Sequence, residues 1–315
     1  MMVKTSFTLR GVEFKNRVLS ASGTFGYGDE CVDFMNVSEL GGLIMKSLSM
    51  KPRDGNPPTR IVETAGGMLN SIGLANIGVQ RFIVEKLPFL RSLQTAIIAN
   101  IAASTIEEYC EVLDTLEGVE GVDGYEINVS CPNVKEGGLS FGTSCELTGE
   151  ITRRLRARTE KPLIIKLTPN VTHISDFARA VEGAGADAVS VINTLIGMAV
   201  DVKTRKPILS TVTGGLSGPA IKPVALAKVY ETARAVQIPV IGIGGIMNTT
   251  DALEFLMVGA TAVQVGTVNF IDPAAGTKIA AGIEQYCADH QIDDTGALVG
   301  SLDARTGVSV LDTWL

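Results

Sequence analysis

Short apolar runs rich in β-branched residues alternate with helical patterns along most of this 315-residue chain. The apolar residues within each run are continuous rather than alternating, as is typical of parallel strands that are covered on both faces. Strand followed by helix, repeated about eight times, predicts an α/β fold of the (β/α)8 or TIM-barrel type, with an open doubly wound sheet as the less favoured alternative. The expected strands are residues 17–22, 42–46, 96–100, 124–128, 163–166, 188–193, 240–244 and 262–266.

Five of the intervening segments predict helices, at residues 105–116, 146–158, 175–184, 223–235 and 250–258. Ser104 and Glu107 form an S-x-x-E capping box at the start of the first helix. Because no domain boundary is visible, we expect residues 1–315 to form a single domain. Two long βα-loop insertions interrupt the barrel pattern, at about 47–79 and 200–219, and the second predicts a hairpin of residues 199–202 and 208–212.

The amino-acid composition limits which binding partners and which cellular compartment the chain is expected to have. A formal net charge of −7 argues against nucleic-acid binding, which needs clustered Lys and Arg. The sequence has no secretion-signal pattern and no apolar stretch of the roughly 20 residues that a membrane span requires. Five widely spaced cysteines without a C-x-x-C pair disfavour disulfides, zinc and iron–sulfur clusters on this chain. We expect a reduced, cytoplasmic protein without a metal site, because no spacing singles out the candidate carboxylates Glu63, Glu126 and Asp187.

Polar or small residues stand at the carboxyl end of each expected strand. A (β/α)8 barrel places its chemistry on that face, so these residues predict a binding site. Asn and Ser also favour strand ends for conformational reasons, but two lysines directly after apolar runs are costly places for charge. The residues are Ser22, Lys46, Asn100, Asn128, Lys166, Asn193, Gly244–Gly245 and Gly266–Thr267.

Two glycine-rich exits follow the last two expected strands, at residues 241–246 (IGIGGI) and 263–267 (VQVGT). In such barrels the loops after strands 7 and 8 commonly bind phosphate through backbone N–H groups and a helix N-terminus. The residues alone leave open whether that phosphate belongs to a substrate or to a cofactor.

A single cysteine, Cys131, lies just past an expected strand in a loop rich in Pro and Gly. A thiol in that place can abstract a proton if its thiolate is accessible. The other four cysteines are expected to be incidental or buried, and neither His173 nor His290 has the neighbours that a Ser-His-Asp hydrolase needs.

Taken together, these motifs resemble dihydroorotate dehydrogenase over about residues 7–286. The Cys in the loop, with no membrane extension before the barrel, resembles class 1, and residues 134–138 with 141–143 resemble class 1B. The segments that carry the resemblance are 21–28 (ASGTFGYG), 57–64 (PPTRIVET), 68–74 (MLNSIGL), 128–133 (NVSCPN), 192–194 (INT) and 216–223 (LSGPAIKP), together with the two glycine exits.

The resemblance implies oxidation of dihydroorotate to orotate in de novo pyrimidine synthesis. Cys131 would remove the C5 proton while hydride passes from C6 to N5 of FMN, and Lys166 would stabilise the charge that develops on the flavin. Flavin-binding residues would be Ser22, Lys46, Ser47, Asn100, Asn128, Lys166, Ile192, Gly218, Gly244, Gly245, Gly266 and Thr267. Substrate-binding residues would be Lys46, Asn70, Ser71, Ile72, Gly73, Leu74, Asn128, Asn193 and Thr194.

Class 1B enzymes pass electrons to NAD through a separate subunit that carries FAD and a [2Fe–2S] cluster, in a heterotetramer of two catalytic and two electron-transfer subunits. Two departures from the family pattern are Ser144–Cys145, where Asp-Pro is usual, and an extra C-terminal tail at residues 288–315. Three alternatives remain open from sequence: fumarate or another soluble acceptor as in class 1A, a lyase or synthase using Lys166 as a Schiff-base amine, and a ligand-binding barrel without activity.

Overall fold

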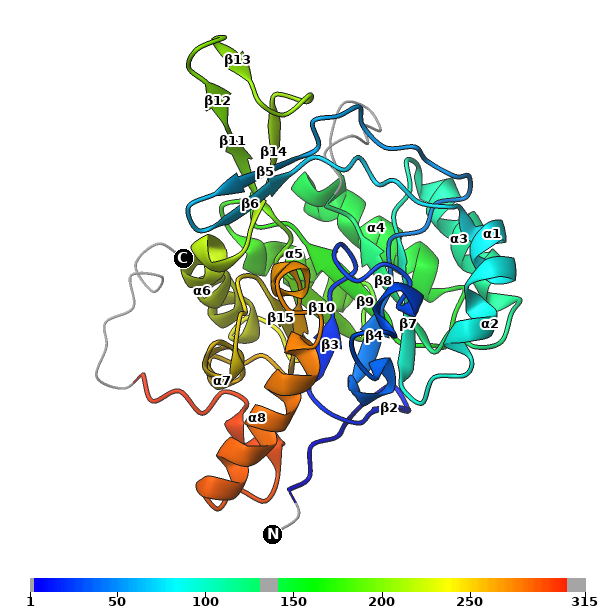
Figure 1. Cartoon of the computed structure of the whole chain (residues 1–315). Helices are drawn as coiled ribbons and strands as arrows, with labels where there is room; N and C mark the ends of the chain where they lie inside the picture. The colour runs from blue at the N-terminus through cyan, green and yellow to red at the C-terminus, as the bar shows by residue number, and fades with distance from the viewer. Residues whose placement is uncertain (1–2, 131–140, 305–315) are drawn as a thin grey trace.

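The protein is built around a closed barrel of eight parallel strands, which confirms the predicted (β/α)8 fold (Figure 1). The structure, a computed structural model, describes residues 3–130 and 141–304. Strands neighbour one another in the order β10-β15-β16-β3-β4-β7-β8-β9, and β9 pairs with β10 to close the ring. The strands are β3 (Val18–Ser20), β4 (Gly42–Ile44), β7 (Ala96–Ile101), β8 (Gly124–Asn128), β9 (Leu163–Leu167), β10 (Ala188–Val191), β15 (Val240–Ile243) and β16 (Ala262–Val265).

Helices cover the outside of the barrel, and the five predicted helices lie within two residues of their expected bounds. Between β3 and β4 the chain makes only two short 3₁₀ turns, η1 (Asp29–Cys31) and η2 (Val37–Glu39), so the first repeat lacks an α-helix. The α-helices are α1 (Val79–Glu85), α2 (Leu87–Leu90), α3 (Ile106–Glu117), α4 (Cys145–Arg156), α5 (Ile174–Gly183), α6 (Lys222–Ala233), α7 (Thr249–Met257) and α8 (Ala275–Asp289).

Helix starts follow local capping chemistry. Thr105, not Ser104, is the N-cap of α3, and its side chain accepts a hydrogen bond from the Glu108 N–H. The Glu108 carboxylate accepts from the N–H of Ser104, the residue before the cap, so the capping residues are Thr105 and Glu108 rather than the predicted Ser104 and Glu107. Ser144 caps α4 by accepting from the Leu147 N–H at 3.3 Å, so Ser at the place of the usual Asp keeps an N-cap at this helix start.

The amino end of the barrel is closed by an N-terminal hairpin, β1 (Phe7–Leu9) and β2 (Val12–Phe14). Phe14 is fully buried in an apolar cluster with strand residues that include Ile98 and Ile164. The first part of the C-terminal tail lies at the same end, where the buried Arg17 donates to the Thr295 hydroxyl at 2.8 Å. An apolar plug therefore fills the amino end and leaves the carboxyl end for polar groups.

A four-stranded antiparallel sheet lies beyond the carboxyl ends of the barrel strands. Its order is β11-β14-β6-β5, and it joins the two long insertions, which the sequence did not predict to pair with each other. The strands are β5 (Ile61–Thr64), β6 (Gly67–Asn70), β11 (Leu195–Met198) and β14 (Thr213–Ser217).

The predicted hairpin exists, but its bounds were wrong. Its tip is formed by β12 (Val200–Asp201) and β13 (Lys206–Pro207), and residues 208–212 form no strand. The Ser210 N–H and hydroxyl bind carbonyls of Thr59 and Pro57 in the other insertion, and Val212 has a positive φ of 70°. These backbone groups are therefore engaged in a contact between the insertions, which no local sequence pattern reveals.

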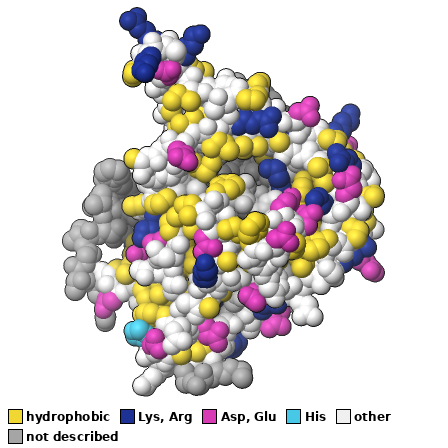
Figure 2. All heavy atoms as spheres, viewed as in Figure 1, with side chains coloured by type: hydrophobic (Ala, Val, Ile, Leu, Met, Phe, Trp, Pro, Cys, Tyr) yellow, Lys and Arg dark blue, Asp and Glu magenta, His cyan; other side chains and the backbone are white. Residues whose placement is uncertain are grey.

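The hairpin projects from the body of the molecule, and Figure 2 shows basic side chains at its tip. Several apolar side chains are exposed along it, including Ile196, Met198 and Val202. Among the described residues, no helix is both long and apolar enough to cross a membrane.

Asp187, one of the candidate carboxylates, precedes β10 at the amino end of the barrel, far from the polar mouth. It pairs with Arg156 at 2.6 Å and Arg10 at 3.1 Å, and it accepts from the Leu163 N–H at 2.8 Å. We expect Asp187→Ala to lower the free energy of unfolding by about 3 kcal/mol, because it leaves a partly buried guanidinium unpaired. Chemical denaturation measures this change.

The matched control is Asp176→Ala, which breaks the exposed pair with Arg179 and should change stability by less than about 0.5 kcal/mol. Equal effects of the two substitutions would contradict the structural role assigned to Asp187.

Candidate functional site

The predicted site residues that lie in the described part of the chain gather at the carboxyl mouth of the barrel. Ser22 follows β3, Lys46 and Ser47 follow β4, and Asn100 lies near the end of β7. Asn128 ends β8, Lys166 lies near the end of β9, and residues 192–194 follow β10. Gly244–Gly245 and Gly266–Thr267 follow β15 and β16.

Asn128, at the end of β8, and Asn193, just after β10, contact each other at this mouth. The Asn193 side-chain amide donates to Asn128 Oδ1 at 3.3 Å, and the Ser130 N–H donates to the same oxygen at 3.2 Å. The Ser130 hydroxyl binds the Lys166 carbonyl at 3.1 Å. The Asn128 amide nitrogen donates no hydrogen bond within the described residues and remains a donor for a ligand.

Three glycine turns converge on one side of the mouth. A Cβ at Gly245 would lie 2.8 Å from the Gly218 carbonyl oxygen, so the turn after β15 contacts the turn after β14 directly. The Thr267 hydroxyl donates to the Ser217 hydroxyl at 2.9 Å, which ties the turn after β16 to the same place. Gly218 precedes η4 (Pro219–Ile221) and the twelve-residue helix α6, whose N-terminus therefore points at this cluster.

This cradle suits an oxyanion such as phosphate. Backbone N–H groups at a helix N-terminus carry partial positive charge, and glycine lets a ligand approach them closely. Gly245, with φ of 73°, and Gly218, with φ of 94°, adopt conformations that other residues avoid. The neighbouring Lys222 is held by Asp251 at 2.6 Å and Glu254 at 2.8 Å, so its charge is already matched.

Lys46 is half-buried, and no hydrogen bond or ion pair holds its ammonium within the described residues. Burial lowers the pKa of Lys46, and the nearby Glu30 carboxylate opposes this effect. Its backbone N–H donates to the Gly26 carbonyl at 2.8 Å, which fixes the chain where it leaves β4. An unpaired, partly desolvated ammonium is a strong attractor for an anionic ligand.

The four-stranded sheet brings Asn70, the last residue of β6, close to the segment that follows β10. Asn70 pairs with Gly215 across β6 and β14, and its amide donates to the Gly215 carbonyl at 3.3 Å. Thr194 packs on Gly215 so closely that a Cβ there would lie 2.2 Å from its hydroxyl oxygen. The sheet therefore links the two groups of predicted substrate residues.

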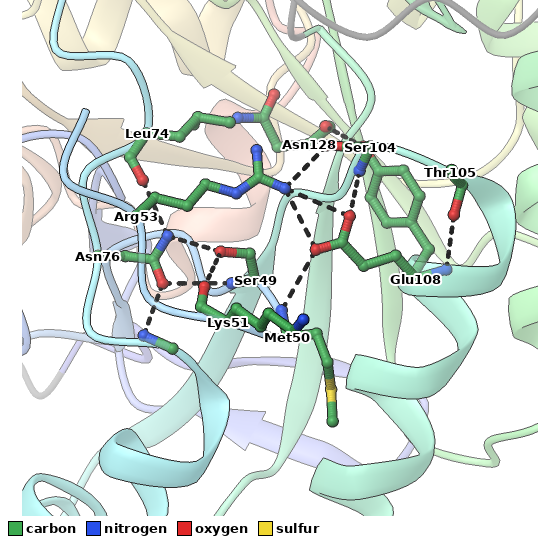
Figure 3. Close-up of polar contacts among 12 residues, drawn as sticks. Ser49, Met50, Lys51, Arg53, Leu74, Asn76, Ser104, Thr105, Glu108 and Asn128 are labelled. Atoms are coloured by element: carbon green, nitrogen blue, oxygen red, sulfur yellow. Dashed lines mark hydrogen bonds and ion pairs between the residues drawn. The ribbon is translucent and has the colours of Figure 1, made fainter. Parts of the chain in front are cut away.

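Asn76 and Arg53 hold this insertion in shape (Figure 3). Asn76 binds four groups: it donates to the Leu74 carbonyl and the Ser49 hydroxyl at 2.8 Å each, and accepts from the N–H groups of Gly78 and Ser49. Arg53 pairs with Glu108 of α3 at 3.2 Å, which attaches the insertion to the barrel wall.

Cys131, the predicted catalytic residue, lies outside the described residues. The flanking segments meet at the mouth, since a Cβ at Gly142 would lie 2.9 Å from the Val129 carbonyl oxygen. Burial raises the pKa of each of the four described cysteines, Cys31, Cys110, Cys145 and Cys287. None of these four therefore has the environment of an activated thiol.

Sequence reasoning missed a polar layer inside the barrel, one pleat below the mouth. Glu126, Ser190 and Gln264 are fully buried there, and Asn100 and Lys166 belong to the same cluster. The available signal was the spacing of Glu126 two residues before Asn128, which puts both side chains on the inner face of β8. Glu63, the third candidate carboxylate, is exposed on β5.

The site fits a flavin mononucleotide in two respects. The glycine cradle can take a phosphate, and the buried Asn100 Oδ1 has no hydrogen-bond partner, which leaves an acceptor for a ligand N–H. Within residues 3–130 and 141–304, no group of three or more His, Cys, Asp or Glu side chains is placed to hold a metal ion.

Comparisons with known proteins by sequence and by structure all point to the same family. Residues 3–287 match the family model described as dihydroorotate dehydrogenase. Relatives named "Dihydroorotate dehydrogenase B (NAD(+)), catalytic subunit" occur in Geobacter sp. (strain M21), 54% identical over 95% of this chain and 98% of the relative, and in Geotalea daltonii, 54% identical over 94% and 97%. A solved structure, DHODH in complex with ferulenol from Eimeria tenella, superposes with a TM-score of 0.80 over 95% of this chain and 88% of that one; at 20% identity it supports the fold.

We expect Lys46→Met to make the ligand-free chain more stable while weakening its site. Because burial lowers the pKa of Lys46 in the folded state, its protonated form reduces stability at every pH below that lowered pKa. The advantage of the variant should shrink as the pH rises from the lowered pKa toward the ordinary value of 10.5. Thermal unfolding across this pH range measures it, and a variant less stable than the wild type at neutral pH would contradict the assignment.

Proposed function

This chain belongs to the dihydroorotate dehydrogenase family, and from that membership we propose how its barrel mouth carries out the reaction. The chain is an oxidoreductase that converts dihydroorotate to orotate in pyrimidine biosynthesis, as the catalytic subunit of an NAD-linked enzyme. The observation that carries the proposal is the convergence of three glycine turns, two lysines and several amides at one mouth.

The family is flavin-dependent, and the proposed flavin is FMN. Its phosphate would lie in the cradle of Gly218, Gly244–Gly245 and Gly266–Thr267, and its ring would lie against residues from the other strand ends. When bound, the flavin supplies the acceptor for the hydride from C6 of dihydroorotate. The ring-side residues in this proposal are Ser22, Lys46, Ser47, Asn100, Asn128, Lys166 and Ile192.

Lys46 is proposed to bind the carboxylate of dihydroorotate, because its ammonium has no ion-pair partner among the described residues. The side-chain amides of Asn128 and Asn193 contain both hydrogen-bond donors and acceptors, which suits a ring with several carbonyl and N–H groups. Residues 70–74 and Thr194 complete the pocket from the four-stranded sheet.

Cys131 is proposed as the base that takes the C5 proton. Its thiolate would accept that proton as the C–H bond breaks and the ring double bond forms. Lys166 would face the pyrimidine edge of the flavin, where a fixed ammonium in a dry site stabilises negative charge without having to reorganise.

The relatives' name, a catalytic subunit, indicates a separate partner subunit. We propose that this partner carries FAD and a [2Fe–2S] cluster and passes electrons to NAD, in a cytoplasmic heterotetramer of two catalytic and two electron-transfer chains. Residues 1–315 would form the single domain of the catalytic chain.

The visible spectrum of the FMN-loaded chain tests this proposal. Anaerobic dihydroorotate should bleach the flavin band. A yellow protein that dihydroorotate does not bleach would contradict the substrate, and a chain that binds no flavin, alone or with its partner subunit, would contradict the cofactor.

Cys131→Ala should leave flavin bound but slow its reduction by dihydroorotate about 10²–10⁴-fold, as the loss of a general base does. Stopped-flow absorbance measures the rate. Cys145→Ala, at a described cysteine whose pKa burial raises, is the matched control and should reduce flavin at the wild-type rate. Near-normal reduction in Cys131→Ala would exclude this residue as the base.

Asn76→Ala should raise KM for dihydroorotate about tenfold with a smaller effect on kcat, because residues 70–74 lose hydrogen bonds that fix their shape. Steady-state kinetics with the partner subunit measure this split. A fall in kcat at unchanged KM would contradict a role in holding the substrate pocket.

A further inference from the structure

Glu126 is a fully buried carboxylate in the centre of the barrel, and the proposed reaction gives it no role. It lies on β8, two residues before Asn128, so it faces inward just beneath the mouth. Its Oε1 accepts from the Asn100 amide at 2.6 Å. Its Oε2 accepts from the Ser190 hydroxyl at 2.9 Å and the Gln264 amide at 2.5 Å.

These bonds determine which way the Asn100 amide points. A carboxylate accepts hydrogen bonds and donates none, so the NH2 group of Asn100 must face Glu126. Its Oδ1 is therefore turned away from Glu126, and it is buried with no hydrogen-bond partner among the described residues. A buried acceptor of this kind destabilises the fold unless a ligand N–H satisfies it.

Lys166 depends on the same carboxylate. Its ammonium lies 3.7 Å from Glu126 Oε1, which is close enough for an ion pair and too far for a good hydrogen bond. Glu126 is the only ion-pair partner of this buried lysine among the described residues. The anion thus compensates the buried charge while the three N–H donors of Lys166 remain for a ligand.

We propose that Glu126 is a positioning residue for the flavin. It fixes Asn100 as an acceptor and Lys166 as a cation for the pyrimidine edge of the flavin, and so sets the affinity for the flavin and its reduction potential. This inference rests on the proposed function. The pyrimidine edge of a flavin carries one N–H between two carbonyls, which matches an acceptor beside an ammonium.

A purely structural role makes a different prediction. Glu126 joins β8 to β7, β9, β10 and β16, so its loss could simply loosen the barrel. A loosened barrel would unfold at a lower temperature, but loosening alone does not predict whether the reduction potential of the flavin rises or falls.

The test is Glu126→Gln, measured for the dissociation constant of oxidised FMN and for the midpoint potential of the bound flavin. The carboxamide keeps the shape but has one acceptor and one donor, so at least one neighbouring amide must turn over. Removing the anion also leaves Lys166 uncompensated, which favours the negatively charged reduced flavin. We expect the dissociation constant to rise at least tenfold, and the potential to rise by about 30 mV or more, which is a tenfold change in the two-electron equilibrium.

Glu231→Gln is the matched control. Glu231 is also buried, accepts from the Ser175 N–H and hydroxyl at 3.2 and 3.0 Å, and pairs with Lys228 at 3.1 Å, but it lies on α6 outside the barrel. The Glu231→Gln variant should be less stable than wild type, but its dissociation constant for FMN and its flavin midpoint potential should be unchanged. A wild-type potential and affinity in Glu126→Gln, or equal shifts in the two variants, would overturn the proposal.

If Glu126→Gln does not fold, Glu126→Asp is the variant to measure. It keeps the charge but is one methylene too short to reach Asn100, Ser190 and Gln264 together. The potential should stay within about 30 mV of wild type while the dissociation constant rises at least tenfold. An unchanged dissociation constant would overturn the proposal, whereas a wild-type chain that binds no FMN would instead refute the proposed function.

Discussion

The closure of the barrel is the constraint on which the rest of the structure depends. Every neighbouring pair in the ring is parallel, including β9 with β10 and β16 with β3, so all eight strands run in the same direction around one axis. Every carboxyl end therefore opens at the same mouth, and residues more than 240 positions apart in sequence, such as Ser22 and Thr267, are brought to one place. No local interaction could assemble these residues without the closed ring.

Within the ring, the interior changes from apolar to polar over a single pleat. Ile98 and Ile164 belong to the apolar layer, while Asn100 and Lys166, two residues further along the same strands, belong to the polar one. A buried polar layer is stable only when its groups are paired, and Glu126 pairs most of them. Asn100 Oδ1 and the ammonium N–H groups of Lys166 are left without hydrogen-bond partners among the described residues and would serve a ligand, so stability and binding both depend on this carboxylate.

The sequence was sufficient to predict the barrel, because buried parallel strands and amphipathic helices leave periodic patterns. The polar and small residues that it placed at the strand ends lie within two residues of the observed ends. It could not predict the sheet that joins the two insertions, since Asn70 and Gly215 pair across 145 positions without a local signal. The polar layer around Glu126 was missed for a similar reason: each member is a single residue in an apolar strand, and only barrel closure brings them together.

The two halves of the site are also mechanically linked. Ser217 ends β14 of the four-stranded sheet and binds Thr267, which belongs to the glycine cradle. Gly67, at the start of β6, lies so close that a Cβ there would be 1.9 Å from the Ser217 carbonyl oxygen. The strand that positions residues 70–74 therefore rests on the turn that would hold the phosphate. A ligand in the cradle would therefore stabilise the proposed substrate side of the pocket through the hydrogen bond between the Thr267 and Ser217 hydroxyls and through the backbone contact of Gly67 with Ser217.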